Sequence, residues 1–294
     1  GGPDTSDLVA DSLSVTCDAD SAIVAMDPMA GTGSVEGQAC MPLTYRQVAN
    51  VDVAARETVA VQGTEGDDTF SVLADGTVSH AVLGVAAEVV VIAENLVIDA
   101  LGGDDEVIVY PSNTFANGIQ VVGGDNGTGS DVLAFTGTGN TITVDLEALL
   151  ITEAGLGPVS FAGIEHVGVD ASAANVEVLG TASGDDVTFS PTTSDGGQLT
   201  LADMSTLFDL MGVTALNVNA LGGDDTLVVN GTSAGEMIGV DGTTVGVGGL
   251  LPLAYSDFEA LAVNGHEGDD TFTVTPSSIP VFVDGGSPVG RLQG

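Results

Sequence analysis

A short acidic motif, repeated along the chain, is the part of the sequence best suited to chemistry. Each of five copies has a glycine followed by two aspartates, usually with an apolar residue two positions after the second aspartate. The pairs are Asp67 with Asp68, Asp104 with Asp105, Asp185 with Asp186, Asp224 with Asp225, and Asp269 with Asp270. Glycine permits a turn with positive φ, turn carbonyls supply hard oxygen ligands, and carboxylates add the charge that calcium requires. These aspartates are therefore candidate metal ligands.

A sixth stretch has a single aspartate in a similar setting. Its sequence is Gly127-Thr128-Gly129-Ser130-Asp131-Val132-Leu133, and Asp131 joins the candidate ligands. The copy that ends at Asp186 departs from the pattern, because Thr188 stands where the others have an apolar residue. We therefore expect that copy to be degraded.

The same residues have a purely structural explanation. Aspartate and glycine are common turn residues, and an aspartate at the start of a strand can accept hydrogen bonds from loop amides without any metal. The sequence alone leaves both explanations open.

Catalysis is not expected from these motifs. Polysaccharide-cleaving enzymes with a β-solenoid fold use clusters of acidic residues. They usually also need a lysine or arginine that stabilises developing negative charge, or a paired acid and base in a cleft. The chain has no lysine, and Arg46, Arg56 and Arg291 show no relation to the aspartate pairs. The three histidines, His80, His166 and His266, lack the spacing of metal ligands, so structural roles are expected.

The charge of the chain limits its partners. Acidic residues number 42 against 3 basic ones, which gives a net charge of −39, yet 44% of the residues are hydrophobic. That apolar fraction is enough for a core and argues against a disordered acidic tail. Nucleic acid and anionic lipid are excluded because both are bound through lysine and arginine, so cations are the expected partners. The most apolar stretch, residues 81–98, contains Glu88 and Glu94 and is too short to span a membrane.

Short alternating runs bounded by glycine, asparagine and aspartate predict an all-β fold. The predicted strands include residues 69–73, 106–110, 119–122, 141–146, 175–179, 226–229, 271–275 and 281–284. Three of the four spacings between neighbouring motifs are 37, 39 and 45 residues, whereas a β-sandwich needs ~100 residues, so a parallel β-solenoid is favoured over tandem β-sandwich domains. One short helix is predicted over residues 201–211, where apolar residues share one helical face.

The motifs are themselves part of a longer duplication. Gly66 and Gly184 are 118 residues apart, and Gly103 and Gly223 are 120 residues apart. We predict a first β-repeat unit over residues 1–126 and a second over residues 127–294 with an extra partial copy. The only cysteines, Cys17 and Cys40, predict a disulfide in an oxidising compartment, with two buried free thiols as the alternative.

The acidic motifs resemble those of two known groups of proteins. The order glycine, any residue, aspartate, any residue, apolar residue resembles the second half of the repeats-in-toxin (hemolysin-type) nonapeptide, which implies calcium binding. That family runs its repeats in uninterrupted tandem, whereas the present motifs are isolated. The layout also resembles acidic repeat proteins of bacterial cell surfaces, in phrases such as Val281-Phe282-Val283-Asp284-Gly285-Gly286. This second resemblance implies a secreted or surface-anchored stalk, adhesin, sheet or fibre.

The two ends of the sequence resemble the two parts of one internal repeat. The phrase from Val281 to Gly286 is similar to Ile119-Gln120-Val121-Val122-Gly123-Gly124, which leads into the Asp131 stretch. Near the other end, Ser6-Asp7-Leu8-Val9 stands after Gly1-Gly2-Pro3. We expect the C-terminal end of one unit to meet the N-terminal end of the next, within a longer protein or by head-to-tail stacking in a fibre.

These observations predict an extracellular structural repeat protein that forms a fibre, stalk or surface layer. It is expected to be secreted or located at the cell surface, to be stabilised by calcium and to bind other copies of itself head-to-tail. Binding to nucleic acid and insertion into membranes are not expected. An adhesin for glycans or proteins is the alternative, and a β-helical polysaccharide lyase or hydrolase is the third possibility.

Overall fold

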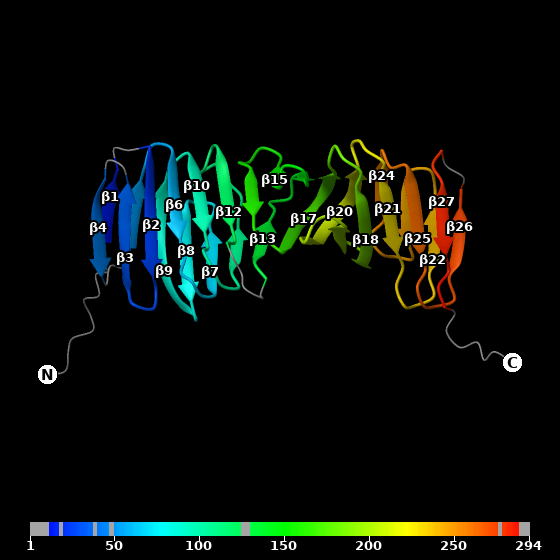
Figure 1. Ribbon diagram of the computed structural model, residues 1–294, viewed down its shortest axis with the longest axis horizontal. Helices are drawn as coiled ribbons and strands as arrows, with labels where there is room; N and C mark the ends of the chain where they lie inside the picture. Colours follow the sequence, from blue (N-terminus) through cyan, green and yellow to red (C-terminus); the bar gives the residue numbers. More distant parts are fainter. Residues whose placement is uncertain are drawn as a thin grey trace. The chain divides into compact units, whose positions relative to one another are not determined.

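The computed structural model consists of β-strands joined by turns (Figure 1). It describes residues 12–17, 20–37, 40–46, 50–124, 130–275 and 278–287, and within these ranges it has 27 strands and no helix. The predicted all-β class and the parallel β-solenoid are confirmed, with about seven turns of solenoid. Two compact units are formed by Gly1–Leu133 with Gly155–Ile164, and by Ala134–Ala154 with Glu165–Gly294. This division follows contacts in space, and the predicted division into repeats near residue 126 stays a prediction.

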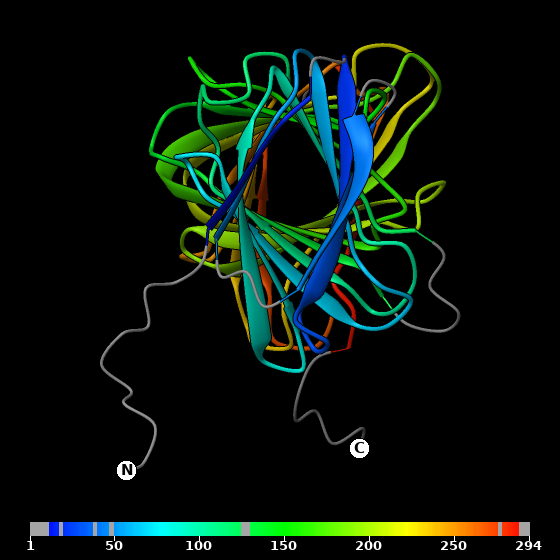
Figure 2. The same cartoon turned by 90° about the vertical axis from the view of Figure 1, so that its left-hand side faces the viewer.

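The first unit is built on three parallel ladders. Its strands are β1 (Ser12–Thr16), β2 (Ser21–Asp27), β3 (Thr32–Gly37), β4 (Cys40–Arg46), β5 (Asn50–Ala54), β6 (Thr58–Gln62), β7 (Asp68–Val72), β8 (Thr77–Val82), β9 (Val85–Ile92), β10 (Asn95–Asp99), β11 (Glu106–Val109), β12 (Gly118–Val122) and β16 (Val159–Ala162). One ladder joins β2, β6, β10, β12 and β16, the second joins β1, β5 and β9, and the third joins β7 and β11. Figure 2, seen from the β1 end, shows these ladders around a common interior.

Alternating side chains of each strand fill that interior. In the longest ladder Val24 is in register with Val61, and Ile98 with both Val61 and Val121. All four are completely buried. Because burial of one such side chain stabilises a fold by about 1.5–3 kcal/mol, these aligned aliphatic stacks hold successive turns together.

The second unit repeats this construction. Its strands are β14 (Ile142–Asp145), β15 (Leu150–Glu153), β17 (His166–Leu179), β18 (Asp186–Thr193), β19 (Gly196–Leu201), β20 (Leu207–Asn219), β21 (Thr226–Asn230), β22 (Met237–Val240), β23 (Thr244–Val247), β24 (Leu253–Ser256), β25 (Ala260–Asn264), β26 (Thr271–Val274) and β27 (Val281–Asp284). Its parallel ladders join β14, β17, β20 and β24, then β18, β21, β25 and β27, and finally β22 and β26. The remaining strand, β13 (Val132–Thr136), begins in the first unit and ends in the second.

Antiparallel hairpins interrupt the parallel winding at several points. The antiparallel pairs are β2 with β3 and β3 with β4, β7 with β8 and β8 with β9, β14 with β15, β18 with β19 and β19 with β20, and β22 with β23 and β23 with β24. The individual strands near the motifs follow from the sequence pattern, with Val281–Asp284 at its predicted bounds, whereas these hairpins do not follow from it.

The helix predicted over residues 201–211 is wrong. The segment is the end of β19, a turn and the start of β20, and these two strands pair antiparallel with Leu199 opposite Phe208. Leu199 and Leu201 are buried in β19, and Phe208 and Leu210 are buried in β20, so the true period is two within each strand. A turn between two period-two strands imitated the helical spacing.

Two further findings concern the cysteines and the membrane. Cys17 is buried and disulfide-bonded, while the side chain of Cys40 lies outside the described residues. Among the described residues, no helix has the length and apolar character needed to cross a membrane.

Candidate functional site

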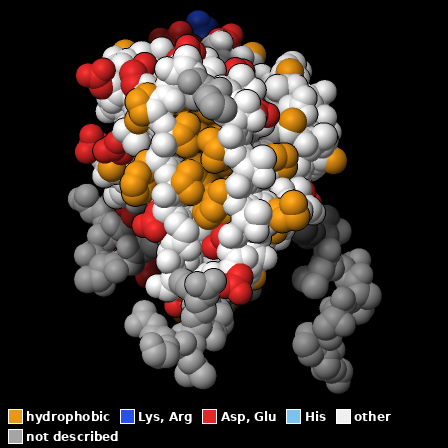
Figure 3. All heavy atoms as spheres, turned by 90° about the vertical axis from the view of Figure 1, so that its right-hand side faces the viewer, with side chains coloured by type: hydrophobic (Ala, Val, Ile, Leu, Met, Phe, Trp, Pro, Cys, Tyr) orange, Lys and Arg blue, Asp and Glu red, His pale blue; other side chains and the backbone are white. Residues whose placement is uncertain are grey.

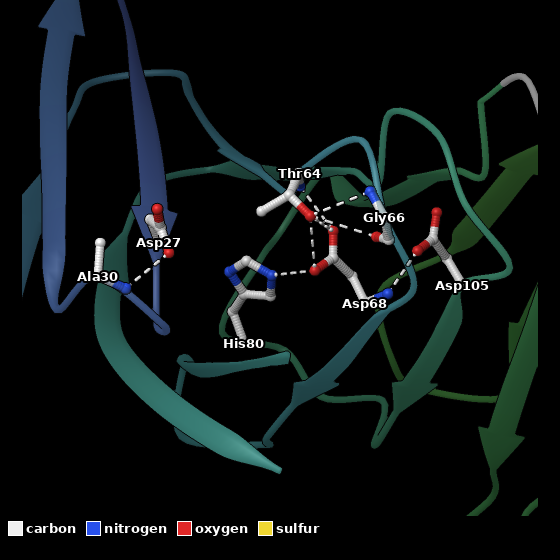
Figure 4. A network of polar contacts seen from close by, with 7 residues as sticks. All are labelled: Asp27, Ala30, Thr64, Gly66, Asp68, His80 and Asp105. Atoms are coloured by element: carbon white, nitrogen blue, oxygen red, sulfur yellow. Dashed lines mark hydrogen bonds and ion pairs between the residues drawn. The ribbon is translucent and has the colours of Figure 1, made fainter. Parts of the chain in front are cut away.

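One buried carboxylate stands at the start of a strand in each acidic turn of the first unit. Asp68, Asp105 and Asp131 are 2%, 2% and 0% exposed. The backbone amide of Asp68 donates to Oδ1 of Asp105 at 2.7 Å, as Figure 4 shows, and the amide of Asp105 donates to Oδ1 of Asp131 at 2.8 Å. Each carboxylate thus binds the backbone of a neighbouring turn. We call this series of bonds the carboxylate ladder.

The second unit has two such ladders. In one, the amide of Asp185 donates to Oδ1 of Asp225, and the amide of Asp225 donates to Oε2 of Glu259, each at 2.7 Å. In the other, the amide of Glu236 donates to Oδ1 of Asp270 at 2.9 Å. The structure therefore brings glutamates into positions that the sequence analysis assigned only to aspartates.

The sequence did contain a signal for Glu236. The phrase Gly231-Thr232-Ser233-Ala234-Gly235-Glu236 repeats Gly180-Thr181-Ala182-Ser183-Gly184-Asp185 with glutamate in place of aspartate. Glu259 follows no glycine motif, and only the stacking of turns identifies it.

The degraded copy expected at Asp186 is an intact copy displaced by one residue. Asp185 is 7% exposed and enters the carboxylate ladder, whereas Asp186 is exposed on β18. The apolar residue two positions after Asp185 is Val187, which is completely buried. The expectation was wrong because the second aspartate of the pair was taken as the functional one in every copy.

Three of the turns are closed by a threonine four residues before the ladder carboxylate. The amide of Thr64 donates to Oδ2 of Asp68 at 2.6 Å, and its hydroxyl donates to the same carboxylate (Figure 4). Thr181 makes the equivalent bonds to Asp185, and Thr232 makes them to Glu236. In these closed turns both carboxylate oxygens have donors.

Three further turns are open, because a different residue occupies the threonine position. Leu101, Leu221 and His266 stand there with φ values of 77°, 70° and 65°. Each of these residues lies four positions before a ladder carboxylate. The Oδ2 atoms of these carboxylates, in Asp105, Asp225 and Asp270, are buried and have no hydrogen-bond partner among the described residues. A buried oxygen without a donor disfavours the ionised carboxylate.

The pKa values agree with this geometry. Burial raises the pKa of Asp105 to about 7. The hydrogen bond from the Asp68 amide lowers this pKa, whereas repulsion from the carboxylates of Asp68, Asp131 and Asp67 raises it further. Burial likewise raises the pKa of Asp225, with smaller contributions from neighbouring carboxylates. The open turns at Asp105 and Asp225 therefore favour a proton on their buried carboxylates.

His80 supports one closed turn from the inside. It lies on β8 opposite Phe70 of β7, is completely buried, and stacks on the Phe70 ring with centroids 4.4 Å apart. Its Nε2 atom is 2.8 Å from Oδ1 of Asp68 (Figure 4). This placement gives His80 the structural role that was predicted. His166 is half-buried, with Nε2 2.6 Å from Oδ2 of Asp209.

The first aspartate of most pairs faces solvent instead. Asp67, Asp104, Asp224 and Asp269 are exposed. The amide of Asp104 donates to Oδ1 of Asp67 at 3.0 Å, so these two outer residues also stack from turn to turn. They place part of the negative charge along the surface of each unit.

The carboxylates do not form a calcium cage within the part of the chain that the structure describes. No group of three or more histidine, cysteine, aspartate or glutamate side chains there could hold a metal ion. Calcium takes six to eight oxygen ligands, whereas the buried carboxylates each bind an amide. Gly127, Thr128 and Gly129 lie outside the described residues. Calcium binding stays a prediction from the sequence.

Comparisons of the chain with family models, curated proteins and solved structures found no match. Its function is therefore argued from the geometry of the ladders.

Proposed function

We propose that this chain is a non-catalytic, extracellular structural module that builds a fibre, stalk or surface layer by head-to-tail assembly. The carboxylate ladder is the observation that carries this proposal. The ladder carboxylates of Asp68, Asp105 and Asp225 are almost completely buried, and each accepts a hydrogen bond from a backbone amide of its own or an adjacent turn. A general acid, base or nucleophile must instead reach a substrate.

Repetition supports the same conclusion. The closed turns at Asp68 and Asp185 have the same threonine, the same bond lengths from its amide and the same bond to the next turn. Geometry repeated along a solenoid stabilises the stacking of neighbouring turns, which is what a mechanical scaffold requires. The proposed role thus uses the acidic residues as structural bonds.

Surface charge suits an environment rich in salt. Exposed aspartates such as Asp67 and Asp104 stack with no lysine anywhere in the chain to offset them. Repulsion between copies is screened over about 10 Å at 0.1 M salt and over about 3 Å at 1 M. Assembly of this chain should therefore depend on ionic strength.

Sedimentation velocity and electron microscopy of the full chain test the proposal. We expect linear assemblies that lengthen with protein concentration and with salt. A particle that stays monomeric over all concentrations and salts would contradict assembly, and release of reducing ends from a polyuronate would contradict the non-catalytic assignment.

A further inference from the structure

The last turn of the second unit has an open strand edge. β26 pairs in parallel with β22, and no described strand pairs with its other side. The inward-facing Phe272 is only half-buried, whereas Phe70 and Val107, at the same position of earlier motifs, are completely buried. Val274, next along the inner face, is 40% exposed. Figure 3, which faces this end, shows a cluster of hydrophobic side chains open to solvent.

The carboxylate ladder also stops at this edge. The amide of Glu236 donates to Asp270, as the amide of Asp68 donates to Asp105. In the first unit the ladder goes on, because the amide of Asp105 donates to Asp131. Among the described residues nothing occupies the corresponding place beyond Asp270. The edge therefore lacks a strand that starts with an acidic residue and has an apolar residue two positions later.

The turn after β27 leads toward this place. A Cβ atom on Gly286 would lie 1.6 Å from the carbonyl oxygen of His266, and one on Gly124 would lie 1.7 Å from that of Leu101. The two turns thus make the same close approach to the turn beneath them. The Gly124 turn leads into Asp131 and β13, and the Gly286 turn leads to Ser287, which bonds to His266 and Gly268.

Residues 6–10 have the sequence that the open edge requires. Ser6-Asp7-Leu8-Val9 matches Ser130-Asp131-Val132-Leu133, with an apolar residue two positions after the aspartate. The residues that follow Ser287 in the same chain, Pro288-Val289-Gly290-Arg291-Leu292-Gln293-Gly294, contain no acidic side chain. Residues 288–294 therefore do not supply the missing carboxylate.

We infer that residues 6–10 of a second copy pair in parallel with β26, where Asp7 accepts from the amide of Asp270 and Val9 covers Phe272. The register follows the first unit, in which Asp105 accepts from Asp68 and Val107 lies opposite Phe70. Main-chain bonds of the added strand give affinity, and the buried Val9 gives specificity. This inference rests on the proposed head-to-tail assembly and names the segment that joins the copies.

Cysteine cross-linking of full-length chains tests the register. Leu8 is opposite Thr271 in the inferred pairing, a separation that a disulfide can span between neighbouring strands. A mixture of the Leu8→Cys and Thr271→Cys variants should give a covalent dimer under mild oxidation. The mixture of Leu8→Cys with Thr273→Cys is the matched control, because it is displaced by two residues and should cross-link at least about tenfold less.

A second pair of variants tests the carboxylate. Asp7→Ala should weaken assembly at least about tenfold, whereas Asp4→Ala, with the same change in charge, should leave it within about twofold. Assembly that is insensitive to Asp7→Ala and gives no cross-link between positions 8 and 271 would overturn the inferred pairing of residues 6–10 with β26, while the proposed function would stand. A chain that never assembles would refute both. A cross-link confined to monomers of the Leu8→Cys/Thr271→Cys double variant would overturn the inference as well.

Discussion

The amide nitrogen of Asp68 lies 2.7 Å from Oδ1 of Asp105, 37 residues later in the chain. Both residues are buried, so this bond joins adjacent turns at a place that water does not reach. The same relationship between Asp185 and Asp225 shows that it is a general device of this fold. The acidic motif is thereby explained as a means of stacking turns.

Asp105→Ala should lower the free energy of unfolding by about 1–3 kcal/mol at pH 5, because the buried Asp68 amide loses its acceptor. Chemical denaturation of the two proteins measures the change. Asp104→Ala is the matched control, since Asp104 is exposed and its loss should change stability by less than about 0.5 kcal/mol. Equal effects of the two substitutions would show that the ladder bond contributes nothing.

The raised pKa of Asp105 predicts the direction of one pH effect. Its ordinary value is 3.8 and its folded value is about 7, so between these pH values the folded state holds a proton that the unfolded state has released. Stability from this group is complete below the unfolded pKa and is lost as the pH rises toward and through about 7.

Asp105→Asn removes this titration and keeps an oxygen for the Asp68 amide. We expect the variant to lose less stability than the parent protein when the pH is raised from about 5 to about 8. Thermal unfolding across that range, with Asp104→Asn as control, checks the prediction. Parallel pH profiles for the parent and Asp105→Asn would contradict it.

The strands around the motifs could be predicted because their signal is local. An inward apolar residue two positions after the acidic residue, as at Phe70 and Leu227, defines both the start of a strand and its buried face. The error at Asp186 has a physical cause, since a pair of adjacent aspartates looks the same whichever member turns inward. The helix error has another, since the turn between β19 and β20 gave two alternating strands a helical spacing.

The partners of the carboxylates could not be predicted in the same way. Asp105 meets an amide in a turn 37 residues before it, and the amide of Asp225 meets Glu259, which has no motif of its own. Such contacts depend on the number of residues in each turn of the solenoid and on inserted antiparallel strands such as β8 and β19. Once the structure is known, the sequence distinguishes closed from open turns by the residue four positions before the carboxylate, which is threonine at residue 64 and leucine at residue 101.

The effect of calcium on stability distinguishes specific binding, predicted from the sequence, from non-specific screening of charge. Buried carboxylates that already bind amides leave few oxygens for a metal, so the geometry favours screening over specific binding. We expect calcium and sodium chloride at equal ionic strength to raise the melting temperature equally, because both screen the charge of −39. A chelator should then cause no shift at constant ionic strength. A stoichiometric metal that survives dialysis, with a calcium-specific rise of several degrees, would instead support the ligand role predicted for the aspartates.

Gly124 tests how closely the turns must approach. It has a φ of 102°, and a Cβ atom there would lie 1.7 Å from the backbone oxygen of Leu101, so Gly124→Ala requires the two turns to separate. Gly155 has a similar φ of 87° with no atom within 4 Å of its added Cβ. Gly155→Ala therefore measures backbone strain alone, at about 1–2 kcal/mol, and Gly124→Ala should cost at least about 2 kcal/mol more. Denaturation of both variants gives this difference, and equal losses would mean that the neighbouring turn yields without cost and that close stacking is not what fixes glycine at this position.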